Sequence, residues 1–90
     1  MGSASSVSAF DDAPRLSSLR AGTRAIVRRV LPDRSGRAER LLALGVTPGA
    51  EIEVLQTFPG VVLRCDETEL AIEPAVARAV LVDVLAPPRG

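Results

Sequence analysis

The chain has 90 residues, a length that predicts one small domain. Its eleven basic residues are all arginines and balance eleven Asp and Glu residues, and this zero net charge argues against nucleic acid as the main partner, because phosphate contacts require excess positive charge on one face. Hydrophobic residues make up 47% of the chain but only two are aromatic, so the core is expected to be aliphatic.

The two ends of the chain differ in composition from its middle. Residues 1–14 are rich in Ser and Ala and show no hydrophobic periodicity, so we expect a disordered leader. Residues 86–90 contain two prolines and are expected to form a disordered tail. One domain is therefore predicted over residues 15–85. It opens with a short extended piece, Leu16–Leu19, that ends at a turn.

A strand and a short helix follow. The β-branched residues of Thr23–Val30 predict a strand, which Pro32 ends. Asp33 or Ser35 is suited to cap the helix that is predicted over Arg37–Leu44. The apolar positions that recur at helical spacing are Ala38, Leu41, Leu42 and Gly45. One face of this helix is therefore expected to pack on the domain.

The segment after the helix has the residue types of a sharp reversal. Gly45 suits the left-handed conformation that ends a helix, and Val46 can then fold back onto the last helical turn. Pro48-Gly49 favours a type II turn, because Pro fixes its own φ and Gly accepts the positive φ that follows. Residues Ala50–Thr57 then alternate as a strand, with Ile52 and Val54 on one face.

The last third of the chain consists of short elements. They are a second Pro-Gly turn at Pro59-Gly60, a hairpin of Val61–Cys65 and Glu69–Ile72, one helical turn at Pro74–Arg78 and a closing strand at Val80–Leu85. In the hairpin, Leu63 and Cys65 are expected to share an inward face with Leu70 and Ile72. The predicted fold is mainly β: a small, partly open antiparallel β-barrel with one short helix inserted between strands and a second helical turn.

Several of these segments together resemble the FeoA family, the small cytosolic component of bacterial ferrous iron uptake. The matching segments are Leu16–Gly22, Arg40–Gly49, Glu51–Leu55, Glu69–Ile72 and Ala79–Val82, in that order. The resemblance extends over Leu16–Leu85 and implies an SH3-like barrel that works beside FeoB, a membrane transporter with a cytosolic GTP-binding domain. The chain has Glu67 where the family often has Gly in the hairpin, so this turn is expected to differ locally.

Catalytic chemistry is nearly absent from the sequence. There is no His, Lys, Tyr or Trp, which removes the usual general bases and Schiff-base formers. Cys65 is the only strong nucleophile, and the strand pattern predicts that it is a buried core thiol. No glycine-rich phosphate loop is present. We therefore expect no enzyme, no catalytic residue and no cofactor.

Metal binding is suggested by the iron-linked resemblance, which associates the family with transition metal ions. The remaining hard ligands are carboxylates, Asp66, Glu67 and Glu69 at the hairpin tip and Glu51 with Glu53 on one strand face. Ferrous sites favour His with carboxylate, and the chain has no His. We interpret these residues as a solvated acidic turn and strand face, and expect no specific metal site.

A partner-binding site is predicted where the helix leaves the barrel. Its residues are Leu44, Gly45, Val46, Pro48 and Gly49, with Leu44, Val46 and Pro48 as apolar contacts and Arg37 and Arg40 as charges at the rim. The resemblance implies that this surface docks on the cytosolic part of a FeoB-type transporter and supports or regulates Fe²⁺ transport.

The expected location and assembly follow from the sequence and this docking. No apolar run is long enough to cross a bilayer and no signal peptide is present, so a cytoplasmic protein that its partner recruits to the inner face of the membrane is expected, without membrane insertion of its own. A monomer is expected, with weak self-association at an exposed strand edge.

Two other functions remain open from the sequence. The arginines Arg24, Arg28, Arg29, Arg34, Arg37 and Arg40 could form the face of a nucleic-acid-binding SH3-like barrel, although aromatic stacking partners are missing. The same SH3-like module also occurs in metal-dependent repressors of the DtxR type. The chain has no preceding DNA-binding segment, so a detached module of that type is the less expected alternative.

Overall fold

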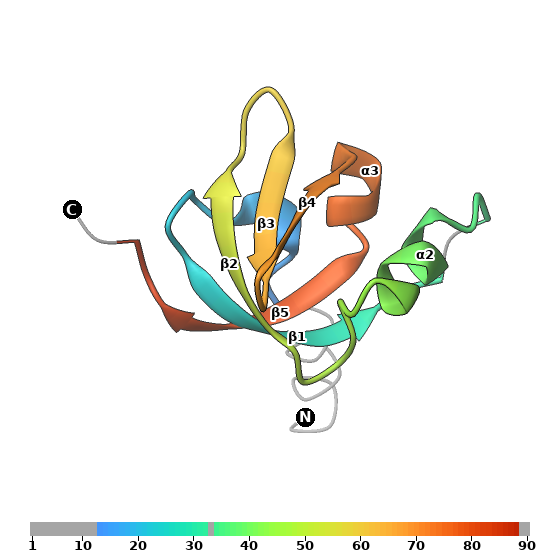
Figure 1. Ribbon diagram of the computed structural model, residues 1–90, viewed down its shortest axis with the longest axis horizontal. Coiled ribbons are helices and arrows are strands. Elements are labelled where there is room, and N and C mark those ends of the chain that lie inside the picture. Colours follow the sequence, from blue (N-terminus) through green and yellow to red (C-terminus); the bar gives the residue numbers. More distant parts are fainter. Residues whose placement is uncertain (1–12, 33, 89–90) are drawn as a thin grey trace, which may run out of the picture.

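The computed structural model describes residues 13–32 and 34–88. Five strands form one antiparallel sheet in the order β4-β3-β2-β1-β5 (Figure 1). The strands are β1 (Arg24–Val30), β2 (Glu51–Gln56), β3 (Val61–Cys65), β4 (Thr68–Ile72) and β5 (Val80–Ala86). The helices are the 3₁₀ turn η1 (Leu16–Ser18), α2 (Arg37–Ala43) and α3 (Pro74–Ala77).

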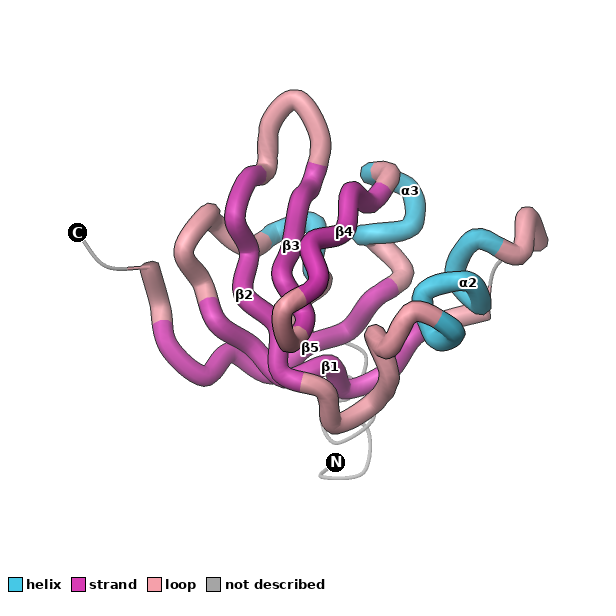
Figure 2. The backbone as a smooth tube through the Cα atoms, viewed as in Figure 1, coloured by secondary structure: helices cyan, strands magenta, loops and turns pink. Residues whose placement is uncertain are grey.

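The sheet is strongly bent into a barrel that remains open. Strands β2, β3 and β4 stand side by side, while β1 and β5 run below them (Figure 2). β1 pairs with both β2 and β5, and its pairing with β5 shifts register between Val27 and Arg29. The two end strands, β4 and β5, do not neighbour each other in the sheet. This confirms the predicted partly open, mainly β barrel with an inserted helix.

The core is aliphatic, as the composition predicted. Alternation along the strands directs Val27, Ile52 and Leu63 inward, and each is at most 1% exposed. The other members of the buried cluster come from every element: Leu16, Leu19, Ala25, Leu41, Val46, Val54, Val61, Cys65, Ile72, Val76, Ala77, Val80 and Val82. The inward face predicted for the hairpin is confirmed, with Leu70 only partly buried.

The N-terminal part of the domain differs from its prediction. Leu16–Ser18 forms a 3₁₀ helix where an extended piece was expected, because this geometry buries Leu16 completely. Ala13 is also buried, and the carbonyl of Pro14 accepts a hydrogen bond of 2.9 Å from the amide of Val82. The packed part of the chain thus begins two residues before the predicted boundary, whereas the rest of the predicted leader lies outside the described residues.

Three local predictions concern turns. Gly49 has φ +95°, and the amide of Ala50 donates to the carbonyl of Thr47 at 2.9 Å, which confirms the type II turn at Pro48-Gly49. The second Pro-Gly pair is different, because the Phe58–Pro59 bond is cis and Gly60 has no positive φ. In the hairpin the positive φ, 58°, falls on Asp66 and not on Glu67, where the family often has Gly.

The helix cap is partly as predicted. The hydroxyl of Ser35 accepts a hydrogen bond of 3.2 Å from the amide of Arg37, but the N-cap position itself is Gly36. The alternative cap, Asp33, lies outside the described residues. At the other end, the amide of Gly45 donates to the carbonyl of Leu42 at 3.2 Å, and the amide of Val46 donates to that of Leu41 at 3.0 Å. These two bonds define a Schellman motif.

Gly45 allows a direct test of this helix end. Its φ is +102°, and nothing lies within 4 Å of a Cβ built there, so Gly45→Ala is expected to lower the free energy of unfolding through the backbone alone, by about 1–2 kcal/mol. Urea denaturation followed by circular dichroism measures this. Gly60→Ala is the matched control, since Gly60 also has open space but no positive φ, and an equal loss in both variants would contradict the account.

Candidate functional site: a groove between α2 and β4

A groove of about 320 Å³ lies at the predicted site, between α2 on one side and β4 with α3 on the other. The α2 side contributes Arg37, Arg40, Leu41 and Leu44, and the opposite side contributes Ala71, Ile72, Glu73 and Val76. The floor consists of the apolar residues Leu41, Ile72 and Val76, each of which is at most 6% exposed. The rim is charged. A groove with this composition is suited to hold an apolar side chain of another molecule.

Leu44 is the most accessible of the large apolar residues that line the groove. It is the C-cap of α2 and is 51% exposed, because the Schellman motif turns the following Val46 into the core and leaves Leu44 outside. Arg37 and Arg40 lie on the same helix. The structure thus brings Leu44, Arg37 and Arg40 together along one groove.

The other predicted contact residues do not line this groove. Val46 is completely buried, so it belongs to the core and cannot be a surface contact as we predicted. Gly45 ends the helix, and Pro48-Gly49 forms the turn that leads into β2. These three residues are exposed, and their evident role is to set the direction of the chain.

The opposite side of the groove was not predicted from the sequence. Ala71, Ile72 and Glu73 follow one another at the end of β4, and Val76 lies in the short α3. No local pattern indicates that this end of the hairpin approaches α2, because that proximity depends on the strand order. The only signal was the run Ile72-Glu73-Pro74, an apolar strand end directly before a helix start.

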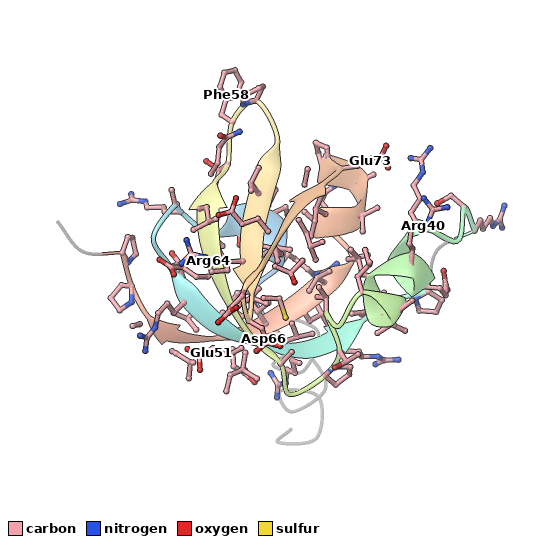
Figure 3. The ribbon with its side chains drawn as sticks, viewed as in Figure 1. Arg40, Glu51, Phe58, Arg64, Asp66 and Glu73 are labelled. Atoms are coloured by element: carbon pink, nitrogen blue, oxygen red, sulfur yellow. The ribbon has the colours of Figure 1, made fainter. Side chains whose placement is uncertain are left out.

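One ion pair spans the groove at its rim. The Arg37 guanidinium lies 2.8 Å from the Glu73 carboxylate, which links α2 to the residue before α3. Both side chains are more than half exposed, so this contact is expected to add little stability. Within residues 13–32 and 34–88, Arg40 has no carboxylate partner. Figure 3 shows Arg40 rising from α2 and Glu73 at the α3 side.

The predicted arginine face is partly neutralised. Arg24 pairs with Glu51 at 3.8 Å, Arg28 pairs with Asp83 at 3.5 Å and Arg37 pairs with Glu73. Within residues 13–32 and 34–88, ion pairs with a carboxylate are thus present at three of the six arginines. This arrangement lowers the positive potential that phosphate binding would need.

Cys65 is buried in the core, as predicted. Its Sγ donates to the carbonyl of Gly45 at 3.5 Å, which ties β3 to the end of α2. Burial raises the pKa of the Cys65 thiol above its ordinary value, and the nearby Asp66 carboxylate acts in the same direction. A raised thiol pKa keeps the nucleophilic thiolate scarce at neutral pH.

This shift predicts how stability depends on alkaline pH. As pH rises, the thiol of the unfolded chain ionises first, from about pH 8.5, because the pKa of the folded thiol is higher. The free energy of unfolding should therefore fall as pH rises from that value through the pKa of the folded thiol, with a slope of at most about 1.4 kcal/mol per pH unit. The sequence has no Lys, Tyr or His to titrate in this range. Urea titrations from pH 8 to pH 11 measure the slope, and Cys65→Ala should remove it; an unchanged slope in that variant would contradict the assignment.

Two features of the described part of the chain concern metal binding and membrane insertion. Among residues 13–32 and 34–88, no group of three His, Cys, Asp or Glu side chains is placed to hold a metal ion. No helix in the same part is long and apolar enough to cross a membrane.

Comparison with known proteins supports the family resemblance. The sequence model of the FeoA domain matches residues 15–84. The crystal structure of an iron uptake regulatory protein, FeoA, has 31% sequence identity and a TM-score of 0.72, and the alignment covers 81% of this chain and 99% of that one. A search of curated protein sequences found no match.

Two further solved structures show how far the similarity to known proteins extends. Zinc-complexed Stenotrophomonas maltophilia FeoA, described as a procaryotic SH3 domain protein, has 27% identity and a TM-score of 0.72, covering 79% of this chain and 91% of that one. IdeR from T. acidophilum has 23% identity and a TM-score of 0.73, but the alignment covers only 34% of its chain against 81% of this one, so this likeness concerns the fold alone. FeoA is therefore the better fit than the repressor type, and with its SH3-like barrel and its match over residues 15–84 the chain belongs to the FeoA family.

Proposed function

We propose that this protein is a non-enzymatic accessory factor of ferrous iron uptake that docks on the cytosolic GTP-binding part of a FeoB-type transporter. Membership of the FeoA family supports the link to ferrous iron transport. The observation that carries the docking is the α2–β4 groove, where the exposed Leu44 lies beside an apolar floor and two arginines. The protein then acts in the cytoplasm and reaches the inner face of the membrane through its partner.

The chemistry of the site supports a binding role. A small apolar area with a charged rim is the usual anatomy of a protein–protein contact. The one lining side chain that could act as a base, Glu73, is exposed and ion-paired with Arg37, and the one thiol of the chain is buried elsewhere. The ion-paired arginines do not favour nucleic acid as the partner.

The direct test is binding to the purified cytosolic domain of the FeoB transporter from the same organism. Isothermal titration calorimetry at physiological salt should show saturable binding in the presence and absence of guanine nucleotide. A parallel titration with single-stranded RNA at low and physiological salt should show none. Binding of RNA that weakens with salt, together with no binding of the transporter domain, would overturn the proposal in favour of the nucleic-acid function.

A further inference from the structure

The free edge of β4 lies in the groove. β4 is the end strand of the sheet, so one of its two edges has no neighbouring strand in the described part of the chain. Ala71 and Ile72, at the end of this strand, line the α2–β4 groove. They also line a second groove of about 300 Å³, whose other residues include Val62 and Gly60 on the β3 side of β4. The free edge itself borders the apolar floor of the α2–β4 groove.

The hairpin register determines which backbone groups face outward. The loop Asp66-Glu67 is closed by the pair Cys65–Thr68, the hydrogen-bonded type of pair next to a two-residue loop. Alternation from this pair directs the backbone N–H and C=O of Leu70 and Ile72 towards β3. The same groups of Glu69 and Ala71 then point away from β3, towards the free edge, where they can accept a further strand.

Charge and side-chain pattern restrict what can occupy this edge. Arg37 is already paired with Glu73, whereas Arg40 has no acidic partner among the described residues. A carboxylate on the occupant would therefore complement Arg40. A side chain that enters the α2–β4 groove meets Leu44 and Val76, so this side chain is favoured as apolar.

The β4 strand of a second copy of this chain does not have the charges that the free edge of β4 favours. β4 and its flanking residues carry Glu67, Glu69 and Glu73 and no basic residue. Two such strands paired antiparallel would place acidic, apolar or hydroxyl side chains opposite these glutamates, and no cation from the strand itself. Like charges on paired strands are destabilising, and charged edges are a known protection against self-pairing.

We propose that an extended, apolar segment of the partner, carrying a carboxylate, adds to the outer edge of β4 as a sixth strand. Its backbone pairs with Glu69 and Ala71, one of its apolar side chains enters the groove beside Leu44, and its carboxylate pairs with Arg40. This mode rests on the proposed docking on FeoB, and it names the shape and chemistry of the contacting segment. Strand addition is an established way to bind an extended peptide with main-chain hydrogen bonds.

Amide hydrogen exchange tests the backbone part of the proposal. The ¹⁵N-labelled chain is mixed with the unlabelled cytosolic domain of FeoB, and exchange is followed for each residue of β4. The amides of Glu69 and Ala71 should slow by about tenfold or more in the complex, whereas those of Leu70 and Ile72 should be slow in both states because they are bonded to β3. Unchanged exchange at Glu69 and Ala71 in a complex that forms would overturn the strand addition alone.

Ala71→Pro removes one of the two outward N–H groups, that of Ala71, without removing a donor to β3. This variant should bind the transporter domain about tenfold or more weakly, whereas Ala71→Ser, which keeps the N–H, should bind as the unaltered chain does. A docking mode that uses side chains only, such as a helix laid in the groove, would tolerate Ala71→Pro, and full affinity of that variant overturns the proposal. Should Ala71→Pro unfold, the exchange pattern of the unaltered chain decides.

Charge reversal and sedimentation distinguish the proposed segment from other occupants of the β4 edge. Arg40→Glu should weaken binding about tenfold, and the matched charge reversal Arg29→Glu, on β1, should not. Sedimentation velocity of the chain alone should give a monomer, and a dimer that Ala71→Pro abolishes would assign the edge to a second copy. Failure of the unaltered chain to bind the transporter domain would overturn the proposed function itself, a result distinct from binding that is indifferent to Ala71.

Discussion

Val46→Asp is expected to unfold the domain. Val46 is completely buried, and its amide closes the Schellman motif at the end of α2. An aspartate there would put a charge into a buried cluster whose described members include no cation. An unpaired buried charge destabilises by about 4 kcal/mol or more, close to the whole stability of a domain of this size. The loss of the strand signal in circular dichroism at 25 °C would show it.

The neighbouring residue provides the control for this effect. Thr47 is exposed, and Thr47→Asp should change the free energy of unfolding by no more than about 0.5 kcal/mol. If Val46→Asp remained folded with near-normal stability, the valine would be accessible after all, and the groove would have to be redrawn to include it.

Leu44→Asp should have the largest effect on binding with the least effect on folding. Leu44 is 51% exposed, so an aspartate there can remain in water and the domain should stay folded. In a complex the same carboxylate would be buried at the centre of an apolar contact. Leu44→Asp should therefore cost about 2 kcal/mol or more of binding free energy, which is a roughly 30-fold loss of affinity. Calorimetric titration of the FeoB cytosolic domain measures this.

The matched control is Leu85→Asp. Leu85 has the same side chain and a similar exposure, 46%, but it lies on β5 and lines neither groove. It should therefore leave the affinity unchanged. Equal losses in both leucine variants would indicate a general effect of charge, and an undiminished affinity of Leu44→Asp would remove the α2–β4 groove from the contact surface. Phe58 is a further apolar control, at the tip of the β2–β3 loop and 85% exposed (Figure 3).

The parts of the fold that were predicted are those with a local cause. Pro48-Gly49, Gly45 and the alternation of Ile52 with Val54 each determine their own neighbourhood, so the turn, the helix end and the strand faces could be predicted from a few residues. The 3₁₀ geometry at Leu16 could not, because it depends on burial against β5 and α3. Tertiary packing there overrides what the short segment would do alone.

In the candidate site, too, the predictable features are those with a local cause. Leu44, Arg37 and Arg40 share one helix, so their common surface could be predicted from helical spacing. The burial of Val46 could not, because the choice between surface and core at a helix end is made by the turn that follows. The opposite wall at Ala71–Glu73 depends on β4 being the end strand, which is set by pairing across the whole chain.

The position of α2 has a consequence for how such proteins can diverge. The helix belongs to the connection between β1 and β2 and is anchored mainly by the buried Ala38 and Leu41, while its junctions hold Gly36, Gly45 and Gly49. One wall of the groove is therefore formed by the β1–β2 connection, and the other by the sheet. Changes of length or sequence in this one connection can alter which partner is recognised while the barrel keeps its structure.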